Sequence, residues 1–129
     1  MKIALITDTH FGARNDSIAF NDYFYKFYEN VFFPEIDKRG INTIIHLGDT
    51  MDRRKFVSYK IANDFRTKFI QPIVDRNIDT HILIGNHDTF YKNTNNINFH
   101  HYSNHDTACS CTMTVSKNSV HVCPCFSYW

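Results

Sequence analysis

The chain has 129 residues, of which 43% are hydrophobic and 21% are charged, and its net charge is +1 with neutral histidines. This length suffices for one domain with a modest core, and the balanced charge argues against a nucleic-acid binder that acts through charge alone. No apolar run approaches the roughly 18 residues of a membrane span, and the N-terminal run is not a signal peptide. We therefore expect a cytoplasmic protein with no membrane partner.

The first part of the chain predicts a strand, a helix and a second strand. Residues 2–7 are apolar and are followed by polar residues, as in a buried strand, and residues 42–47 repeat this pattern. Ser17 is placed to cap the helix between them, Pro34 should kink or end that helix, and Gly40 should close the segment. Apolar residues recurring at helical spacing predict its buried face, which consists of Phe20, Phe24, Phe27 and Val31.

The next part predicts a second helix, which Ser58 can cap, and a third strand at residues 80–84. The apolar stripe of this helix consists of Ile61, Phe65, Phe69 and Ile73. About 40 residues separate successive strands, which leaves room for a crossover helix each time. We therefore predict an α/β fold with a parallel βαβαβ core, whose nearly continuous apolar strands indicate burial on both faces.

A polar stretch follows each of the three predicted strands. The stretches are Asp8-Thr9-His10, Gly48-Asp49-Thr50-Met51-Asp52-Arg53 and Gly85-Asn86-His87-Asp88. Because ligands bind beyond the carboxyl ends of strands in open α/β sheets, these side chains should meet at one edge of the sheet. Each stretch alone is common in turns, but carboxylate, imidazole and amide oxygen together suit a divalent first-row ion such as manganese or iron, and zinc less exclusively. The three stretches therefore predict a metal site.

These three stretches resemble the calcineurin-like metallophosphoesterases, and within them the recombination nucleases of the SbcD type, above all their branch in T-even-like phages. The resemblance covers roughly residues 1–98. It implies that this part is the N-terminal half of a metallophosphoesterase sandwich. It also implies a centre of two divalent metal ions, with manganese as the first candidate and magnesium or iron as alternatives, that hydrolyses DNA phosphodiester bonds in recombination and repair.

The resemblance also implies a role for each residue that matches the family's motifs. Asp8 and His10 would hold one ion, Asp49 would bridge both ions, and Asn86 would hold the second through its amide oxygen. His87 would not bind metal but would face the scissile phosphate and assist the leaving oxygen. The implied partners are DNA and an SMC-like recombination ATPase subunit, and a second copy of the chain is a further candidate. A phage-encoded protein would work in the host cytoplasm.

Three further charged residues receive roles beside this set. We interpret Asp52 and Asp88 as acids that orient imidazoles, and place Asp52 in the catalytic group. Arg53 is a candidate for binding the substrate phosphate, although a solvated loop charge explains it equally well.

The sequence also departs from the family's pattern. The resemblance implies further histidine ligands, among them a Gly-His-x-His pair, and the sequence contains no such pair. We therefore expect the chain to bind manganese weakly and to hydrolyse DNA poorly or not at all. Two alternatives to a DNA nuclease remain: a phosphomonoester or phosphoprotein phosphatase, and a catalytically inactive truncated fragment.

The tail at residues 99–129 differs from the rest in being rich in Cys, His and Ser. Within it, residues 112–116 and 119–123 predict a β-hairpin around a Lys117-Asn118 turn. Three origins compete for the tail. It is the native start of a second sheet, the product of a shifted reading frame, or a zinc site built from Cys109, Cys111, Cys123 and Cys125.

Overall fold

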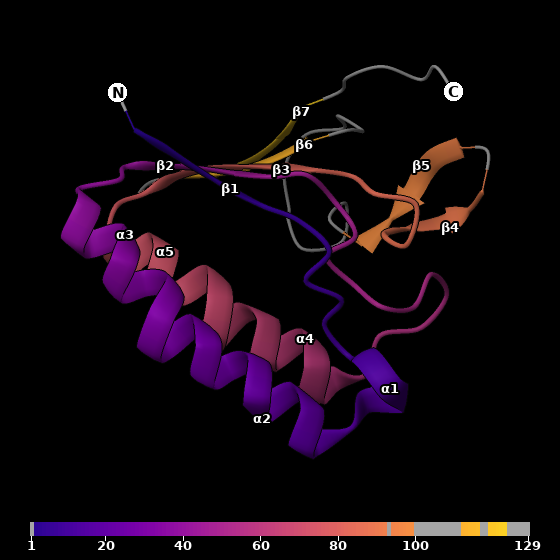
Figure 1. Ribbon diagram of the computed structural model, residues 1–129. Coiled ribbons are helices and arrows are strands. Elements are labelled where there is room, and N and C mark those ends of the chain that lie inside the picture. The colour runs from indigo at the N-terminus through magenta and orange to yellow at the C-terminus, as the bar shows by residue number, and fades with distance from the viewer. Residues whose placement is uncertain (1, 93, 100–111, 117–118, 124–129) are drawn as a thin grey trace.

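The computed structural model describes residues 2–92, 94–99, 112–116 and 119–123 (Figure 1). In chain order its elements are β1 (Ile3–Ile6), α1 (Ala13–Asp16), α2 (Ile18–Phe27), the π-helical segment η1 (Tyr28–Phe32), α3 (Phe33–Arg39), β2 (Thr43–His46), α4 (Tyr59–Phe65), the π-helical segment η2 (Arg66–Ile70), α5 (Gln71–Asp75), β3 (Asp79–Leu83), β4 (Thr89–Tyr91), β5 (Thr94–Asn98), β6 (Thr112–Ser116) and β7 (Ser119–Cys123). Among the described residues, no helix combines the length and the apolar character that crossing a lipid bilayer requires.

The described strands form a five-stranded sheet in the order β1-β2-β3-β6-β7 and a separate β4–β5 pair. Strands β1, β2 and β3 are parallel, with Ile3 opposite Thr43 and Thr43 opposite Asp79. This confirms the predicted α/β fold and its three strands. The predicted hairpin is also confirmed as β6 and β7, and it pairs antiparallel with β3, where Thr80 lies opposite Val115. The hairpin therefore extends the first sheet, although one interpretation of the tail placed it at the start of a second.

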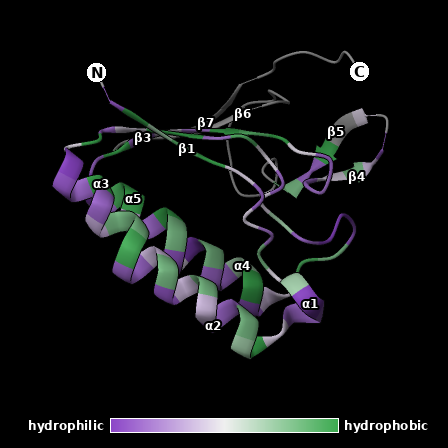
Figure 2. Ribbon diagram, in the orientation of Figure 1, coloured by the Kyte–Doolittle hydropathy of each residue, from purple (hydrophilic) through white to green (hydrophobic). Residues whose placement is uncertain are grey.

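The helices cover one face of the sheet (Figure 1). Ile44 and Ile82 point to that face and are fully buried, whereas Leu5 is 67% exposed and Leu47 48% exposed. The expectation that both strand faces are buried is therefore wrong for the described residues, because both crossover segments return along the same side. Figure 2 shows hydrophobic and hydrophilic residues mixed along the strands and around each helix. Among the described residues, the exposed face of the sheet therefore carries apolar side chains such as Leu5 beside polar ones such as Asp79 and His81.

The first helical segment runs on past Pro34, although the sequence predicted a kink or an end there. Proline has no amide hydrogen, and its ring crowds the carbonyl group four residues earlier. The backbone widens to a π-helix just before it, and the Phe33 amide donates to the Tyr28 carbonyl five residues back. Segment η2 precedes Pro72 in the same way. Each proline is thus accommodated by a local change of winding, and the first segment ends at Gly40, as predicted.

The buried face of this first helical segment differs from the predicted one. Phe27 and Val31 are 42% and 49% exposed, so their assignment to the core is wrong, whereas Tyr25 and Tyr28 are buried. Helical spacing is compatible with either face, the one with Phe27 or the one with Tyr25 and Tyr28, because aromatic residues occupy neighbouring positions on this helix. The hydroxyl of Tyr25 donates to the buried carboxylate of Asp64 at 2.9 Å, which gives this phenol a partner inside the protein. That partner comes from another helix.

The second helical segment follows its prediction closely. Its apolar stripe is buried along its whole length, with Ile61, Phe65, Phe69 and Ile73 each at most 3% exposed. The hydroxyl of Ser58 accepts a hydrogen bond from the amide of Ile61, so this cap is confirmed. Ser17 occupies the corresponding position before α2, but its side chain makes no capping hydrogen bond.

Phe69 lies at the centre of the aromatic core. It is fully buried. Its ring contacts aromatic rings from both helical segments, from the loop after β1 and from the end of β2. The partners within 6.4 Å, centroid to centroid, are Phe11, Tyr28, Phe32, Phe33, His46 and Phe65. This ring therefore links the helices to the ends of the strands that carry the polar stretches.

Replacing Phe69 with alanine should lower the free energy of unfolding by about 3–5 kcal/mol, because the change leaves a large cavity in the core. Phe27→Ala should cost clearly less, about 1–2 kcal/mol, because that side chain is 42% exposed and its removal leaves no closed cavity. Urea unfolding followed by far-UV circular dichroism measures both. Equal losses in the two variants would contradict the observed buried face of the first helix.

Candidate metal centre

The loops after β1 and β2 run side by side and hold each other in place. The amide of Asp8 donates to the Gly48 carbonyl, and the amide of His10 donates to the Asp49 carbonyl, both at 3.1 Å. Phe11 and Met51 continue the pairing as an isolated parallel bridge. The first two polar stretches are thus joined by backbone hydrogen bonds beyond the ends of their strands.

The loop after β3 approaches the same place through two glycines. A Cβ atom on Gly85 would lie 2.1 Å from the amide nitrogen of Asp49, which is too close for any side chain. A Cβ on Gly48 would lie 2.8 Å from the Cα of Gly85, and Gly48 has a φ of 104° that favours glycine. Both glycines are therefore needed for the second and third stretches to touch.

Asp88 fastens this contact from below the surface. It is 2% exposed, and its two carboxylate oxygens accept hydrogen bonds from the amides of Met51 and Gly85, each at 2.9 Å. Its backbone carbonyl also accepts from the amide of Phe99 at 2.9 Å. The sequence suggested that Asp88 orients an imidazole, which stays a prediction. A bridge between two loop backbones was not foreseen, because nothing in the sequence indicates which amides lie near.

Three predicted ligands come together at this edge of the sheet. Ligand atoms of Asp8, His10 and Asp49 all lie within 4.8 Å of one another. All three residues have positive φ angles, of 52°, 41° and 54°. Such backbone conformations cost about 1–3 kcal/mol each in non-glycine residues and cluster at functional sites. Two carboxylates and an imidazole at these separations are a donor set that fits a divalent first-row metal ion.

The surroundings of Asp8 and His10 favour metal binding. The Thr7 hydroxyl donates to Asp8 Oδ2 at 2.6 Å and, with a smaller contribution from His10, lowers the pKa of that carboxyl group. The His10 ring lies between two acids, with Nε2 3.5 Å from Asp8 Oδ1 and Nδ1 3.6 Å from Asp52 Oδ1. Its Nδ1 is buried and has no hydrogen-bond partner among the described residues. The ring thus lies between two carboxylates.

Asp52 and His87 lie beside this group. The Nδ1 atom of His87 is 2.6 Å from the backbone carbonyl of Asp52, and a carbonyl can only accept, so Nδ1 carries the hydrogen. The amide of His87 donates to Asp49 Oδ1 at 2.8 Å, and its ring meets the His10 ring edge-on at 4.9 Å. Asp52 thus contacts both imidazoles, one through its carboxylate and the other through its carbonyl oxygen.

Asn86 turns its amide nitrogen, and not its amide oxygen, toward Asp49. Its Nδ2 lies 3.5 Å from Asp49 Oδ2, whereas its Oδ1 accepts a hydrogen bond from Arg54 Nη2 at 2.6 Å. The Oδ1 atom that should bind the second ion therefore faces Arg54, and one of its two lone pairs is engaged there. Arg53, the predicted substrate contact, instead donates to Asn15 Oδ1 at 2.6 Å. The sequence gives two adjacent arginines, and the fold brings Arg54 to the predicted ligands.

The chain belongs to the calcineurin-like phosphoesterases, because the model of that family matches residues 1–123. The three polar stretches and the Asp8, His10 and Asp49 cluster therefore stand in a metal-dependent family of enzymes. The cysteine alternative falls largely outside the described residues, since Cys109, Cys111 and Cys125 are not among them.

Within this family the chain is similar to Exonuclease subunit 1 of Enterobacteria phage T4. The two are 41% identical over 56 residues, which is 43% of this chain. The match spans 16% of the phage protein's length. No solved structure matches the chain.

Asp49 should be at least as important as Asp8 for metal binding, because it lies between the first and third polar stretches. Changing only the outer partners of metal ligands lowers affinity by about 10–100-fold, so Asp49→Asn should lower manganese affinity by about as much or more. Calorimetric titration with manganese measures the affinity of Asp49→Asn and of Asp8→Asn. Unchanged binding by Asp49→Asn would remove this residue from the site.

Arg54→Met should raise manganese affinity, because it removes a positive charge that contacts a predicted metal ligand. Relief of charge repulsion at this range is worth on the order of 1 kcal/mol, or about fivefold in affinity. Arg53→Met is the matched control, since Arg53 is bound to Asn15, and it should change affinity less. A fall in affinity for Arg54→Met would show that Arg54 instead orients Asn86 for the metal.

Proposed function

We propose that the protein is a metal-dependent phosphodiesterase that hydrolyses DNA in recombination or repair. The observation that carries this proposal is the convergence of Asp8, His10 and Asp49 with His87 beside them. Family membership gives the phosphoester chemistry. The name of the relative in phage T4, Exonuclease subunit 1, favours DNA as the substrate and a larger assembly as the working form.

In this proposal residues from the loops after β1, β2 and β3 bind two divalent ions, with manganese as the first candidate. Asp8 and His10 would hold one ion, Asp49 would offer its carboxylate to both ions, and Asn86 would hold the second through its amide oxygen. When bound, two such ions acidify water and offset the charge that develops on the phosphate. Asp8 and Asp52, which flank the His10 imidazole, would help to orient it for an ion.

His87 acts as the general acid in this proposal. Its Nδ1 hydrogen is engaged with the Asp52 carbonyl, which fixes the ring and leaves Nε2 as the atom that exchanges a proton with the substrate. In the protonated imidazole, Nε2 donates its proton to the leaving oxygen as the phosphorus–oxygen bond breaks. Asp52 is a positioning residue for this step because it holds both imidazoles. Arg53 and Arg54 supply positive charge for a phosphate, with Arg54 nearer to the ligands.

The proposed partners are DNA and an SMC-like recombination ATPase, and a second copy of the chain could also take part. The word "subunit" in the name of the phage relative supports a partner protein. A phage-encoded protein would act in the cytoplasm of its host.

A manganese-dependent hydrolysis assay tests the function. Linear duplex DNA, single-stranded DNA and a small aryl phosphomonoester serve as substrates for chain 1–129, its His87→Ala variant and a chelator control. We expect slow hydrolysis that requires manganese and prefers DNA, because the described ligands leave coordination positions to water. General acid catalysis contributes about 10²–10⁴-fold, so His87→Ala should fall to the chelator background.

Three outcomes would count against parts of this proposal. Preference for the phosphomonoester would indicate a phosphatase. Hydrolysis at background by the unaltered chain would favour the inactive-fragment interpretation. Full activity in His87→Ala would remove this residue from catalysis.

A further inference from the structure

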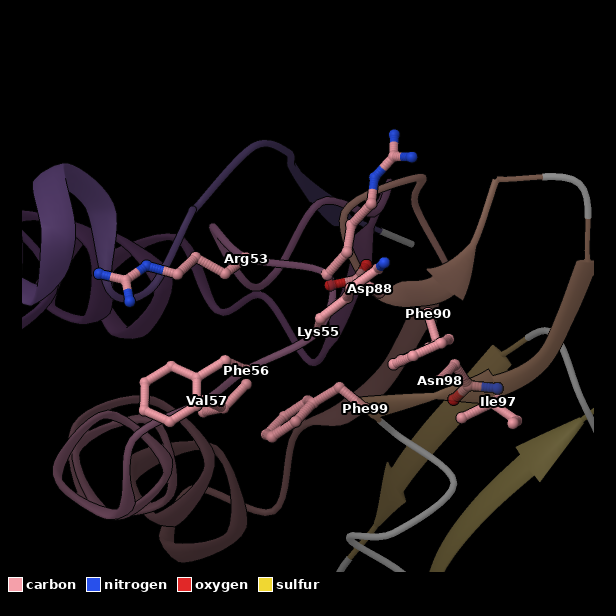
Figure 3. Close-up of a pocket in the computed structure, with 10 residues that line it drawn as sticks. Arg53, Lys55, Phe56, Val57, Asp88, Phe90, Ile97, Asn98 and Phe99 are labelled. Carbon is pink, nitrogen blue, oxygen red and sulfur yellow. The ribbon is translucent and has the colours of Figure 1, made fainter.

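A cavity lies between the loop after β2 and the β4–β5 pair (Figure 3). Its volume is about 170 Å³. Pockets for drug-sized ligands begin at roughly 300 Å³, so this cavity suits a single ring-sized group. The residues of its wall that matter for the argument are Arg54, Lys55, Phe56, Phe90, Asn98 and Phe99.

The cavity shares its wall with the metal centre. Arg54 lines the cavity and donates to the Oδ1 atom of Asn86, which is a predicted metal ligand. Asp88 also lines it and accepts from the amides of Gly85 and Phe99. Arg54 and Asp88 therefore connect the wall of the cavity to the loop that carries Asn86 and His87.

The wall combines aromatic rings with cations. The Phe56 ring is 58% exposed, although it is large and apolar, and the Arg53 guanidinium lies 5.7 Å from its centre. The Lys55 ammonium lies 5.2 Å from the centre of the Phe90 ring. Aromatic faces beside positive charges form the usual surface on which bases of single-stranded nucleic acid stack while cations follow the backbone.

The same wall carries polar groups that can bind a base or a phosphate. Arg54 Nη1 is buried and has no hydrogen-bond partner among the described residues. A buried donor without a partner is costly, so a ligand oxygen at this position would be stabilising.

We propose that this cavity receives one unpaired base of a single-stranded DNA segment whose neighbouring phosphate lies at the metal centre. The inference rests on the proposed function, since it defines where the strand lies in that same site. Phe56 and Phe90 stack against the base, and Arg53, Arg54 and Lys55 neutralise the adjoining phosphates. A paired base is held in its stack by both neighbours and cannot enter without being flipped out, so the cavity selects unpaired DNA over intact duplex.

Fluorescence binding titrations with full chain 1–129 in chelator test this proposal, since no hydrolysis occurs without metal. The probes are a short single-stranded oligonucleotide, a series in which one abasic nucleotide moves along it, and the intact duplex. Base stacking on an aromatic side chain contributes enough that an abasic nucleotide at one position should weaken binding about fivefold or more. The other positions should change it little, and the duplex should bind more weakly.

Phe56→Ala is the informative variant, because this exposed ring can be removed without disturbing the core. In this variant the position-specific abasic effect should shrink to about twofold or less. Tyr59→Ala is the matched control, since Tyr59 is 97% exposed, lies three residues away and does not line the cavity. It should keep the pattern of the unaltered chain.

Three results would overturn the proposal: no position-sensitive abasic effect, an effect that persists in Phe56→Ala, or duplex binding as tight as single-strand binding. The hydrolysis assay separates this failure from that of the proposed function. Hydrolysis of DNA without the abasic pattern would overturn the cavity's role alone. The abasic pattern without manganese-dependent hydrolysis would overturn the enzymatic proposal alone.

Discussion

The close approach of Gly85 to the backbone of Asp49 is the contact on which the candidate metal centre depends. At this point there is no room for a side chain, since a Cβ on Gly85 would lie 2.1 Å from the Asp49 amide nitrogen. The contact lets the third loop reach the second, so that the His87 amide can bond the Asp49 carboxylate. Asp88 then fastens the two loops with hydrogen bonds to their backbones. Two glycines and one buried acid thus determine where the ligands lie.

The aromatic core supports this arrangement from one side of the sheet. Phe69 packs against Phe11 in the loop after β1 and against His46 at the end of β2. His46 in turn accepts from the Gly48 amide through Nδ1, and its Nε2 lies 3.0 Å from the Thr9 hydroxyl. The packing of the helices is thereby connected to the two loops that carry the carboxylates. The opposite face of the sheet has no such support among the described residues.

Strain and charge are concentrated where the three loops meet. Asp8, His10 and Asp49 hold positive φ angles, which short polar side chains tolerate better than branched ones. Backbone hydrogen bonds between the loops offset the cost of these conformations. The carboxylates gather negative charge in a small volume, and Arg54 supplies a nearby positive charge by bonding Asn86.

The sequence alone determined the strands, the second helix and the identity of the ligand-bearing loops, because these follow from short-range patterns. Apolar runs ended by polar residues define the strands, and parallel order brings their carboxyl ends to one edge. The fold therefore follows from local periodicity and from the chain length between strands. The predicted metal ligands follow because each is close to a strand end.

Only the tertiary structure decided which of several equivalent local patterns prevails. Tyr25 and Tyr28, and not Phe27, face the core, because a buried acid on another helix receives a phenol hydroxyl. Arg54, and not Arg53, reaches the ligands, because the loop directs the two neighbouring side chains to different partners. Adjacent residues of the same kind are equivalent in the sequence. They become different only when distant segments supply, or fail to supply, a hydrogen-bond partner and a place in the packing.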